Sequence, residues 1–434
     1  MDLSAIRIDT HRLQKDLVHL GNFGEVPGGG LMRTALSEAD LEARRWFKSR
    51  MEEAGLRVRE DAVANLIGRL DPPAVSSSSS CIAIGSHIDS VPNGGKFDGA
   101  LGLCVGLEAI RAIRESGLSL LCPLELLVFT DEEGSHYAGT FGSRAMLDLL
   151  LEGEIDRSKN ESQPSLAADL LRIGKDPARI AEAIRRATEF RAFLEVHVEQ
   201  GPILNAMNIP IGIVEGIVFL ERHIIRVVGQ SGHAGTIPMH LRDDALVKAA
   251  RIITAVSDAL VHFGTDIVGT IGNLQVHPGA FNIIPGRVDM LLDLRAMDEL
   301  TLASGRNTIR KIVESEKNVQ TELILSKGGI SMDGDLMKLI EDSCRERGIP
   351  CTRMGSGAGH DAMSFQTRGI PTGMIFIPCE KGKSHGPEEA IRWEDATRSA
   401  QVLADAVVKI GIVEREERNI SSQGCIQAKP CSRR

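Results

Sequence analysis

Two segments of the chain concentrate side chains that bind metal ions. The stretch GSHIDSVPNGGKFDG supplies His87, Asp89 and Asp98, and the segment TDEEG adds Glu132 and Glu133. Imidazole and carboxylate groups are hard to borderline donors, and they suit Zn, Mn, Co or Ni. These residue types in this arrangement therefore indicate a metal site that is assembled from distant parts of the chain.

The first segment offers two carboxylates with different roles. Asp98 is the best candidate for a bridging ligand, because one carboxylate can bind two metal ions. Asp89 stands two residues after His87, so in an extended chain both side chains share a face. Asp89 could then accept the second ring N–H of His87 and fix its tautomer. The alternative without a metal is that His87 caps a strand and Asp98 caps the helix that begins near Ala100, which leaves the rest of the cluster unexplained.

Glu132 and Glu133 are adjacent, so their side chains point in different directions. One could bind a metal while the other faces a reacting water. Two like charges this close repel each other unless a cation or a proton intervenes. The alternative is a solvated acidic turn, which is disfavoured because the pair directly follows the apolar run LLVF.

Three histidines further along the chain have motifs of their own. His197 stands in FLEVHVEQGP, where it alternates with Glu195 and Glu199, and His385 stands in KSHGPEE. Either histidine on its own would more often be structural. His233 lies in the glycine-rich loop GQSGHAG, from which it could reach a substrate oxygen; an exposed turn is the alternative.

Alternating strands and helices must position these residues. The predicted strands at 81–86, 124–130 and 192–198 alternate with helices, one of them at 41–54. This order predicts an α/β fold with a mainly parallel sheet and helices on both faces. Sites in such sheets form beyond the carboxyl ends of the strands, where His87, Glu132, Glu133 and His197 fall.

A second unit interrupts this pattern. Strands are predicted at 221–228, 267–276, 287–294 and 321–325, with helices at 241–263 and 300–316. An apolar strand at 373–378 then returns to the first fold, just before His385. We therefore expect a metal-binding catalytic domain of residues 1–212 and 330–434, and an inserted, smaller α/β-sandwich lid of residues 213–329. The serine run 76–80 predicts a flexible loop, and the tail after Glu414 is expected to fray.

Composition excludes several classes of protein. The 434 residues are too many for one ordinary core, so two domains are expected. A net charge of −9 without a basic stripe argues against nucleic-acid binding. No apolar run predicts a membrane span, and the N-terminus does not predict a secretion signal. The eight cysteines form no CxxC pair, which favours a reducing, cytoplasmic location.

Taken together, these motifs resemble the M20 metallopeptidase-like superfamily. They are most similar to its hydantoinase/carbamoylase amidase branch, which includes N-carbamoyl-L-amino acid hydrolases, allantoate amidohydrolases and one lineage of β-ureidopropionases. The resemblance runs from Arg33 to about Ala404, and it rests on GSHIDS, FDG, DEEG, FGSR, HVEQGP, GHAG, GHDA and SHGPEE. Peptidases of the superfamily usually carry a carboxylate where His197 stands, so His197 favours the amidases.

The resemblance implies two divalent metal ions, Zn or alternatively Mn, Co or Ni, and a homodimer formed through the lid. One ion would be held by His87, Asp98 and His197, and the other by Asp98, Glu133 and His385. Glu132 would be the general base, with Asp89 supporting catalysis behind His87. His233 would stabilise the oxyanion from the lid, including across a dimer interface.

The resemblance also implies a substrate-binding set. A substrate carboxylate would be held by residues matching Gln200, His233, Asn282 and Arg295, together with Gly359. From the residues alone, Arg295 could equally be an ordinary arginine at a strand end, and Asn282 could be a turn residue. Two departures from the family bear on the substrate, namely Lys383 before Ser384-His385 and Phe219 in the lid.

We therefore expect a binuclear metal-dependent hydrolase of linear C–N bonds in a small amide or ureido substrate. An N-carbamoyl-L-amino acid or a related ureido acid fits best. Two alternatives remain at this point: an aminoacylase or peptidase of the same superfamily, and a homologue that binds metal and ligand without catalysis. The motifs do not fix the native metal, the substrate side chain or the stereochemistry.

Overall fold

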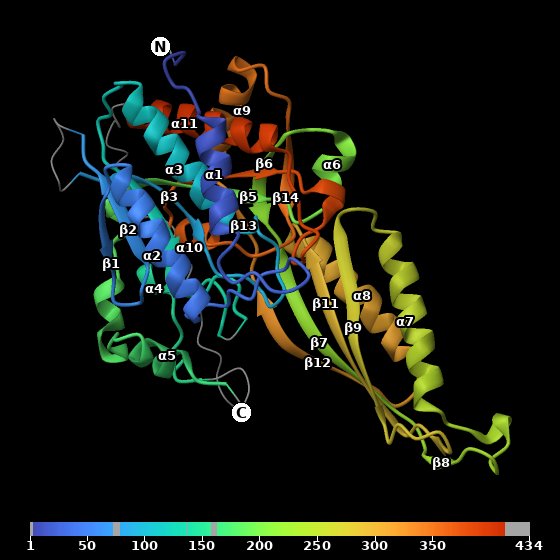
Figure 1. The fold of residues 1–434 in the computed structure, drawn as a ribbon. Helices are drawn as coiled ribbons and strands as arrows, with labels where there is room; N and C mark the ends of the chain where they lie inside the picture. The colour runs from blue at the N-terminus through green and yellow to red at the C-terminus, as the bar shows by residue number, and fades with distance from the viewer. Residues whose placement is uncertain (1–2, 73–78, 136, 158–162, 413–434) are drawn as a thin grey trace.

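The computed structural model describes residues 3–72, 79–135, 137–157 and 163–412, and within them two principal sheets (Figure 1). The larger sheet has nine strands, and the smaller one has four strands and projects from the main body. Serines 76–78 of the predicted loop and the tail after Glu414 lie outside the described residues.

The larger sheet has a parallel centre. Strands β4, β3, β5 and β15 lie side by side and parallel, whereas β1, β2 and β13 pair antiparallel at the margins and β14 pairs parallel with β6. In sheet order the strands are β1 (Arg57–Glu60), β2 (Leu66–Leu70), β4 (Leu124–Phe129), β3 (Cys81–His87), β5 (Phe190–Val198), β15 (Thr372–Ile377), β6 (Ile211–Ile217) and β13 (Ile330–Ser331), with β14 (Cys351–Ser356) beside β6.

Helices cover both faces of this sheet. One face packs against α1 (Thr10–Leu20), α2 (Glu38–Glu53), α3 (Ala100–Glu115), α9 (Gly334–Glu346) and α11 (Trp393–Ile412). The other face packs against α4 (Phe141–Met146) and α10 (Ala362–Thr367), with α5 (Leu166–Arg172) beyond them and α6 (Ile203–Met207) beside the sheet. Short 3-10 helices span Pro177–Ala183, Ala187–Glu189, Met239–Leu241 and Glu380–Gly382.

Strand β3 shows why the central strands are apolar without alternation. Ile82 and Ile84 belong to the core on one face, while Cys81 and Ala83 belong to the core on the other. A strand that is buried on both faces has no polar side, so its sequence is a continuous apolar run. The predicted α/β fold with a parallel sheet between two helical layers is confirmed.

The four-stranded sheet is built from the chain between β6 and β13. Its strands are all antiparallel, in the order β12 (Val319–Lys327), β7 (Phe219–Val228), β11 (Arg287–Ala296) and β9 (Ile267–His277). Helices α7 (Ala245–Val261) and α8 (Glu299–Glu314) bury apolar residues against one face. The short pair β8 (Gly232–His233) and β10 (Ile283–Ile284) forms the far tip of this lid (Figure 1).

Two helix starts differ from the sequence prediction because of their caps. Helix α2 begins at Glu38 rather than Leu41, because the Ser37 side chain accepts the N–H of Asp40. Helix α7 begins at Ala245, because Asp244 accepts the N–H groups of Leu246 and Val247. The helix predicted at 241–263 therefore starts too early, because it includes the end of the short 3-10 helix Met239–Leu241 before this cap.

Cys81 and Cys104 are buried core residues. In the part of the chain that the structure describes, no helix combines the length and the apolar character needed to cross a bilayer.

A candidate metal centre at the carboxyl ends of the central strands

Four segments meet at one edge of the central sheet. His87 ends β3, the pair Glu132 and Glu133 follows β4, and His197 is the penultimate residue of β5. His385 comes from the loop after β15. These parallel strands end at the same edge, which brings residues that are hundreds of positions apart into one site.

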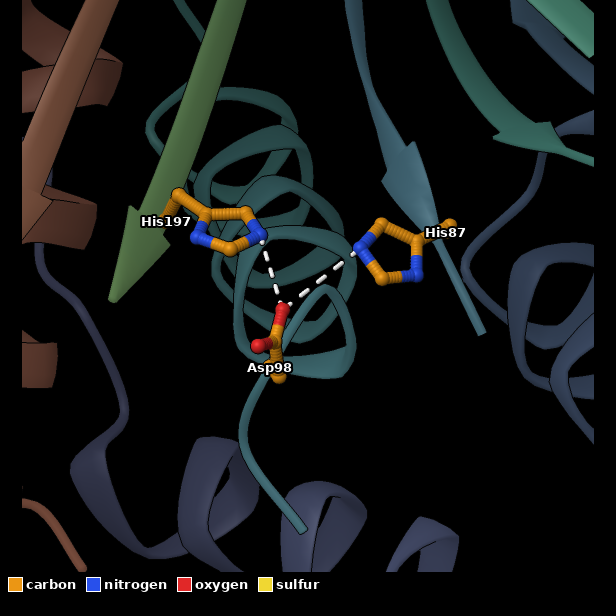
Figure 2. Close-up of side chains that lie close together, drawn as sticks. All are labelled: His87, Asp98 and His197. Carbon is orange, nitrogen blue, oxygen red and sulfur yellow. Dashed lines mark ion pairs between the residues drawn. The ribbon is translucent and has the colours of Figure 1, made fainter. Parts of the chain in front are cut away.

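Asp98 joins two groups of ligand-type side chains. Its Oδ1 atom lies 3.1 Å from Nε2 of His197 and 3.6 Å from Nε2 of His87 (Figure 2). Its Oδ2 atom lies 3.2 Å from Nε2 of His385, which in turn is 3.7 Å from Oε2 of Glu133. The ligand atoms of His87, Asp98 and His197, and those of Asp98, Glu133 and His385, form two sets within 4.8 Å.

The residues fit divalent cations. His87 Nε2 and Glu133 Oε1 are buried and have no hydrogen-bond partner among the described residues. Buried polar atoms are costly when they are left unpaired, and His87 belongs to the first ligand set and Glu133 to the second. A neutral imidazole and a carboxylate are suitable donors for Zn, Mn, Co or Ni.

The electrostatics of the site also favour bound cations. Burial, and then the charges of Asp361 and Glu133, raise the pKa of Glu132 well above its ordinary value. Burial and the Asp98 charge likewise raise the pKa of Glu133. Burial opposes a charge on His197, but the Asp98 carboxylate outweighs it and raises the pKa of that ring to about 9. Positive charge placed among these acids would relieve their repulsion.

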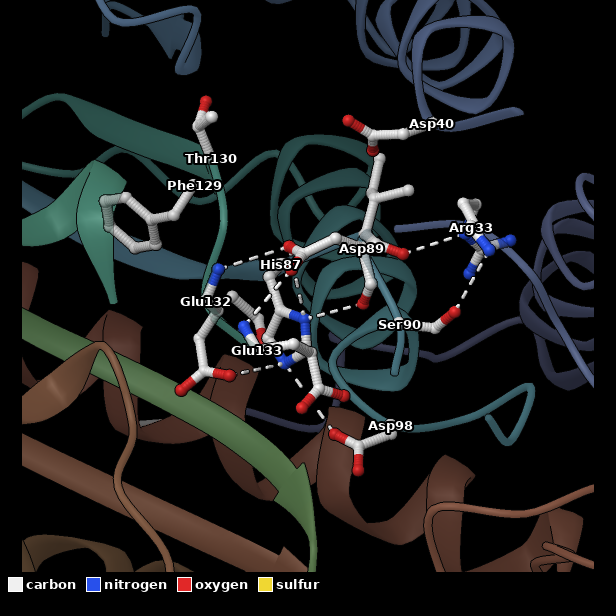
Figure 3. A network of polar contacts seen from close by, with 12 residues as sticks. Arg33, Asp40, His87, Asp89, Ser90, Asp98, Phe129, Thr130, Glu132 and Glu133 are labelled. Atoms are coloured by element: carbon white, nitrogen blue, oxygen red, sulfur yellow. Dashed lines mark hydrogen bonds and ion pairs between the residues drawn. The ribbon is translucent and has the colours of Figure 1, made fainter. Parts of the chain in front are cut away.

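Asp89 connects the two ligand segments, in a way that differs from the prediction. Nδ1 of His87 lies 3.0 Å from the backbone carbonyl oxygen of Asp89, whereas the nearer carboxylate oxygen is 3.6 Å away. The carboxylate instead accepts the backbone N–H groups of Glu132 and Glu133, at 3.3 and 3.1 Å (Figure 3). The backbone therefore fixes the His87 tautomer, and the side chain holds the acidic turn.

Glu389 is a supporting residue that the sequence analysis did not single out. Its Oε2 atom accepts the N–H groups of Phe97 and Asp98, at 2.7 and 3.1 Å, and its Oε1 atom accepts the Ser384 hydroxyl at 2.8 Å. Ser384 also lies 3.2 Å from Oδ2 of Asp98. The signal was present in the motif SHGPEE, of which only His385 had been assigned a role.

Three of the predicted substrate residues lie at or near this centre. Gln200 donates through Nε2 to Oδ2 of Asp98 at 2.8 Å. Arg295, at the end of β11, donates to the carbonyl oxygen of Gly357 at 2.6 Å. Gly359 lies in the same loop, just before His360, whose ring centroid is 4.5 Å from that of His197.

The other two predicted residues lie elsewhere in this chain. His233 is exposed in β8 at the lid tip, and the carbonyl oxygen of Asn282 accepts the neighbouring N–H of Ala234 at 2.9 Å. Strand β11 separates this tip from Arg295, a span of roughly 26 Å at the usual rise per residue. A single chain therefore does not bring His233 and Asn282 to the metal centre.

The two departures from the family pattern have local explanations. Lys383 forms an ion pair with Glu388 beside it, so its charge is offset at the surface. Phe219 packs against the lid core and against Gly329, where a Cβ atom would meet the ring at 2.3 Å.

Comparison with known proteins agrees with this geometry. Residues 83–409 match the family described as Peptidase family M20/M25/M40. The chain belongs to this M20 family. An N-carbamoyl-L-amino-acid amidohydrolase of Pseudomonas sp. (strain NS671) is 36% identical to this M20 protein, over 94% of the chain and 100% of the relative. A ureidoglycolate hydrolase of Oryza sativa subsp. japonica is 34% identical, over 94% of the chain and 86% of the relative.

The same M20 architecture occurs in a solved structure, a hydantoinase/carbamoylase family amidase from Burkholderia multivorans. It superposes with a TM-score of 0.84 at 31% identity, covering 94% of this chain and 98% of that one. The predicted family is thus confirmed, and members of its hydantoinase/carbamoylase amidase branch are among the solved neighbours.

Proposed function

We propose that this protein is a binuclear metal-dependent amidohydrolase that cleaves a linear C–N bond of an N-carbamoyl-L-amino acid or a related ureido acid. The products would be the amino acid, carbon dioxide and ammonia. The observation that carries the proposal is the bridging position of Asp98, between His197 on one side and His385 on the other. The names of the relatives support the substrate class.

The first ion would be held by His87, Asp98 and His197, and the second by Asp98, Glu133 and His385. When bound, such ions lower the pKa of a water molecule and polarise a carbonyl oxygen. They are Zn, Mn, Co or Ni in this proposal, since the donor set suits each of them.

Glu132 would act as the general base. Its Oε2 atom lies 3.6 Å from Nε2 of His87, so it adjoins the ligand set. It would accept a proton from the attacking water and deliver it to the departing nitrogen. Asp89 supports this step by holding the backbone N–H of Glu132.

Gln200, Arg295 and Gly359 would bind the substrate carboxylate beside the ions. Arg295 has the planar fork that suits bidentate recognition of a carboxylate. In this structure its guanidinium is held by Asp293, at 2.7 Å from Nε to Oδ1 and 3.2 Å from the second nitrogen to Oδ2.

A homodimer would complete the site, because His233 and Asn282 are remote from the ions of their own chain. Strand β9 is the edge of the lid sheet and exposes Val268 (57%) and Leu274 (39%), and Val261 at the end of α7 is 75% exposed. An open edge strand and an apolar helix face suit pairing with a second copy. The partner's lid tip would then supply the oxyanion donor.

We also propose that the inserted lid runs from about Val218 to Gly329. It interrupts a catalytic unit that is formed by the segments before and after it in the chain. Strand β6 runs through Ile217 in the larger sheet, so the crossing follows it rather than lying at residue 213. A cytoplasmic location is part of the proposal, and the free thiols of the described cysteines are consistent with it.

A substrate panel tests this function. Purified protein loaded separately with Zn, Mn, Co and Ni would be assayed for ammonia release from N-carbamoyl amino acids, allantoate and ureidoglycolate. N-acyl amino acids and dipeptides serve as the comparison. Release of amino acid from the last two groups alone would favour a deacylase or peptidase, and saturable binding without any turnover would favour a non-catalytic homologue.

A further inference from the structure

One face of the lid sheet carries unneutralised positive charge at the end nearest the metal centre. Leu220 of β7 pairs with Arg295 of β11 on one side and with Lys327 of β12 on the other. Directly paired residues point to the same face of a sheet. Arg295 and Lys327 therefore project together, about 10 Å apart at the backbone, from the face opposite α7 and α8.

A β-bulge places Lys327 on this face. The register between β12 and β7 shifts between Leu323 and Leu325. Without that extra residue, Lys327 would lie opposite Phe219, which packs towards the helix-covered core. Bulges re-aim side chains near functional sites, and here the bulge turns an ammonium group from the covered face to the open one.

This end of the lid adjoins the catalytic unit. Arg295 donates to the carbonyl oxygen of Gly357. Gly355 allows a close approach, because a Cβ atom there would lie 2.0 Å from Sδ of Met297. The side chain of Lys327 is exposed on this face. Loss of hydration, and then the charges of Arg144 and Arg222, lower the pKa of Lys327, while the charge of Glu132 raises it.

The cations here outnumber their partners. Arg222 and Arg295 share the single carboxylate of Asp293, through contacts of 2.9 Å and 2.7 Å. Arg144 is paired with Glu154. Lys327 forms no ion pair with any residue that the structure describes. Among the residues of the lid itself, three cations against one carboxylate leave a local charge of about +2, before Glu132 of the catalytic unit is counted.

We propose that Lys327 is a specificity-determining residue that binds a second acidic group of the substrate, so that the preferred substrates are ureido dicarboxylic acids. This inference rests on the proposed function, in which Arg295 takes the carboxylate common to all ureido acids. Arg295 alone is enough to bind a substrate with one carboxylate. Lys327, which points to the same face of the sheet, would bind an acidic side chain of the substrate. The matching neutral amide could accept a hydrogen bond from the ammonium group but would bring no opposite charge to it.

The test compares N-carbamoylglutamate with N-carbamoylglutamine, which have nearly the same shape and differ in one charge. Metal-loaded wild type should favour the acid by about tenfold or more in kcat/KM, as expected for a charge-assisted hydrogen bond. Lys327→Met should abolish that preference by raising KM for the acid alone, and Lys327→Arg should keep most of it. Lys311→Met, on the exposed side of α8, is the matched control and should change neither substrate.

Two results would overturn the inference: equal use of both substrates by the wild type, or an equal loss on both substrates in Lys327→Met. If the wild type hydrolyses neither compound, the wider substrate panel decides the proposed function, and calorimetry of the same pair decides the inference separately. Tighter binding of the acid that depends on Lys327 and weakens with salt supports it; equal binding contradicts it.

Discussion

The side chain of Asp89 accepts the backbone N–H of Glu133, with 3.1 Å between Oδ2 and the nitrogen. This contact ties the turn after β4 to the segment after β3, so two stretches of chain that carry ligands share one support. The carboxylate is buried and 1% exposed. Its geometry gives the first prediction.

Asp89→Asn keeps the shape of the side chain but replaces one acceptor oxygen with an NH₂ group. One of the two N–H groups of the acidic turn then loses its partner. We expect metal affinity or kcat to fall about 10- to 100-fold, the usual effect of losing support behind a metal ligand. Metal titration and steady-state kinetics measure this, with circular dichroism as the check on folding. Unchanged metal affinity and an unchanged kcat would show that the turn of Glu132 and Glu133 keeps its position without the Asp89 carboxylate.

Glu132→Gln separates catalysis from metal binding. Since Glu132 is proposed as the base rather than a ligand, kcat should fall by at least about 10²-fold while the metal content stays at the wild-type value. Glu133→Gln is the matched variant, and it should lose metal first. Metal analysis of both proteins decides between the roles, and loss of metal in Glu132→Gln would make that residue a ligand.

The bridging position of Asp98 predicts a pattern of metal loss. His197→Ala should weaken the binding of one ion, and His385→Ala should weaken the binding of the other. Asp98→Ala should weaken the binding of both ions. His262→Gln is the control, because this exposed histidine caps the end of α7 in the lid, outside every possible ligand set of the described residues. Metal content per chain, measured after dialysis against a graded chelator, reports the pattern. Equal loss from all four variants would count against two separate ligand sets.

The buried carboxylate of Glu125, which pairs with both Arg185 and Arg69, predicts how stability depends on pH. The carboxylate lies 2.5 Å from Arg185 and 2.8 Å from Arg69. Burial opposes its charge, but Arg185 outweighs this and lowers the pKa of Glu125. A lowered pKa stabilises the fold fully above the unfolded value of about 4.3, and the contribution disappears as pH falls through the folded value.

Glu125→Gln should therefore cost about 3 kcal/mol of unfolding free energy at pH 7. The difference from wild type should narrow below about pH 4, where the wild-type carboxylate also becomes neutral. Urea unfolding at a series of pH values measures both proteins. Glu182→Gln is the control, since its ion pair with Arg179 is exposed at the surface. A gap that widens in acid would contradict the sign of the shift.

The side chains of the candidate metal site could be singled out from the sequence because most of them stand in motifs at or after strand ends. His87 and His197 needed only the rule that parallel strands end at one edge, whereas Asp98 stands in the loop between β3 and α3. The support from Glu389 was not predicted, although its motif was noted, because a sequence pattern does not show which backbone N–H groups, here 292 positions away, a loop carboxylate will accept. For Asp89, the side-chain carboxylate was expected beside the His87 ring, but the backbone carbonyl oxygen lies there. The sequence does not reveal which of the two groups will face a ring. The distance of the lid tip from the metal centre, and the β-bulge that places Lys327 on the open face, depend on how the lid strands pair. An alternating sequence pattern does not fix this pairing register.

The remote position of His233 predicts that two chains share each active site. Glu132→Gln and His233→Ala should each be nearly inactive alone. In a hybrid dimer, the site with a native Glu132 would receive a native His233 from the other chain. If chains exchange at random, half the dimers are hybrids with one working site of two, so mixing should restore about a quarter of wild-type activity.

The mixing experiment has its own control. Mixing His233→Ala with a chain that carries both substitutions should restore nothing, because the native Glu132 then has no native His233 in either chain. Activity would be followed after brief dissociation and reassembly, with size-exclusion chromatography to confirm the dimer. Recovery with the double variant, or none with the two single variants in a proven dimer, would mean that His233 does not act across the interface, and the oxyanion would then require a donor nearer the metal centre of its own chain.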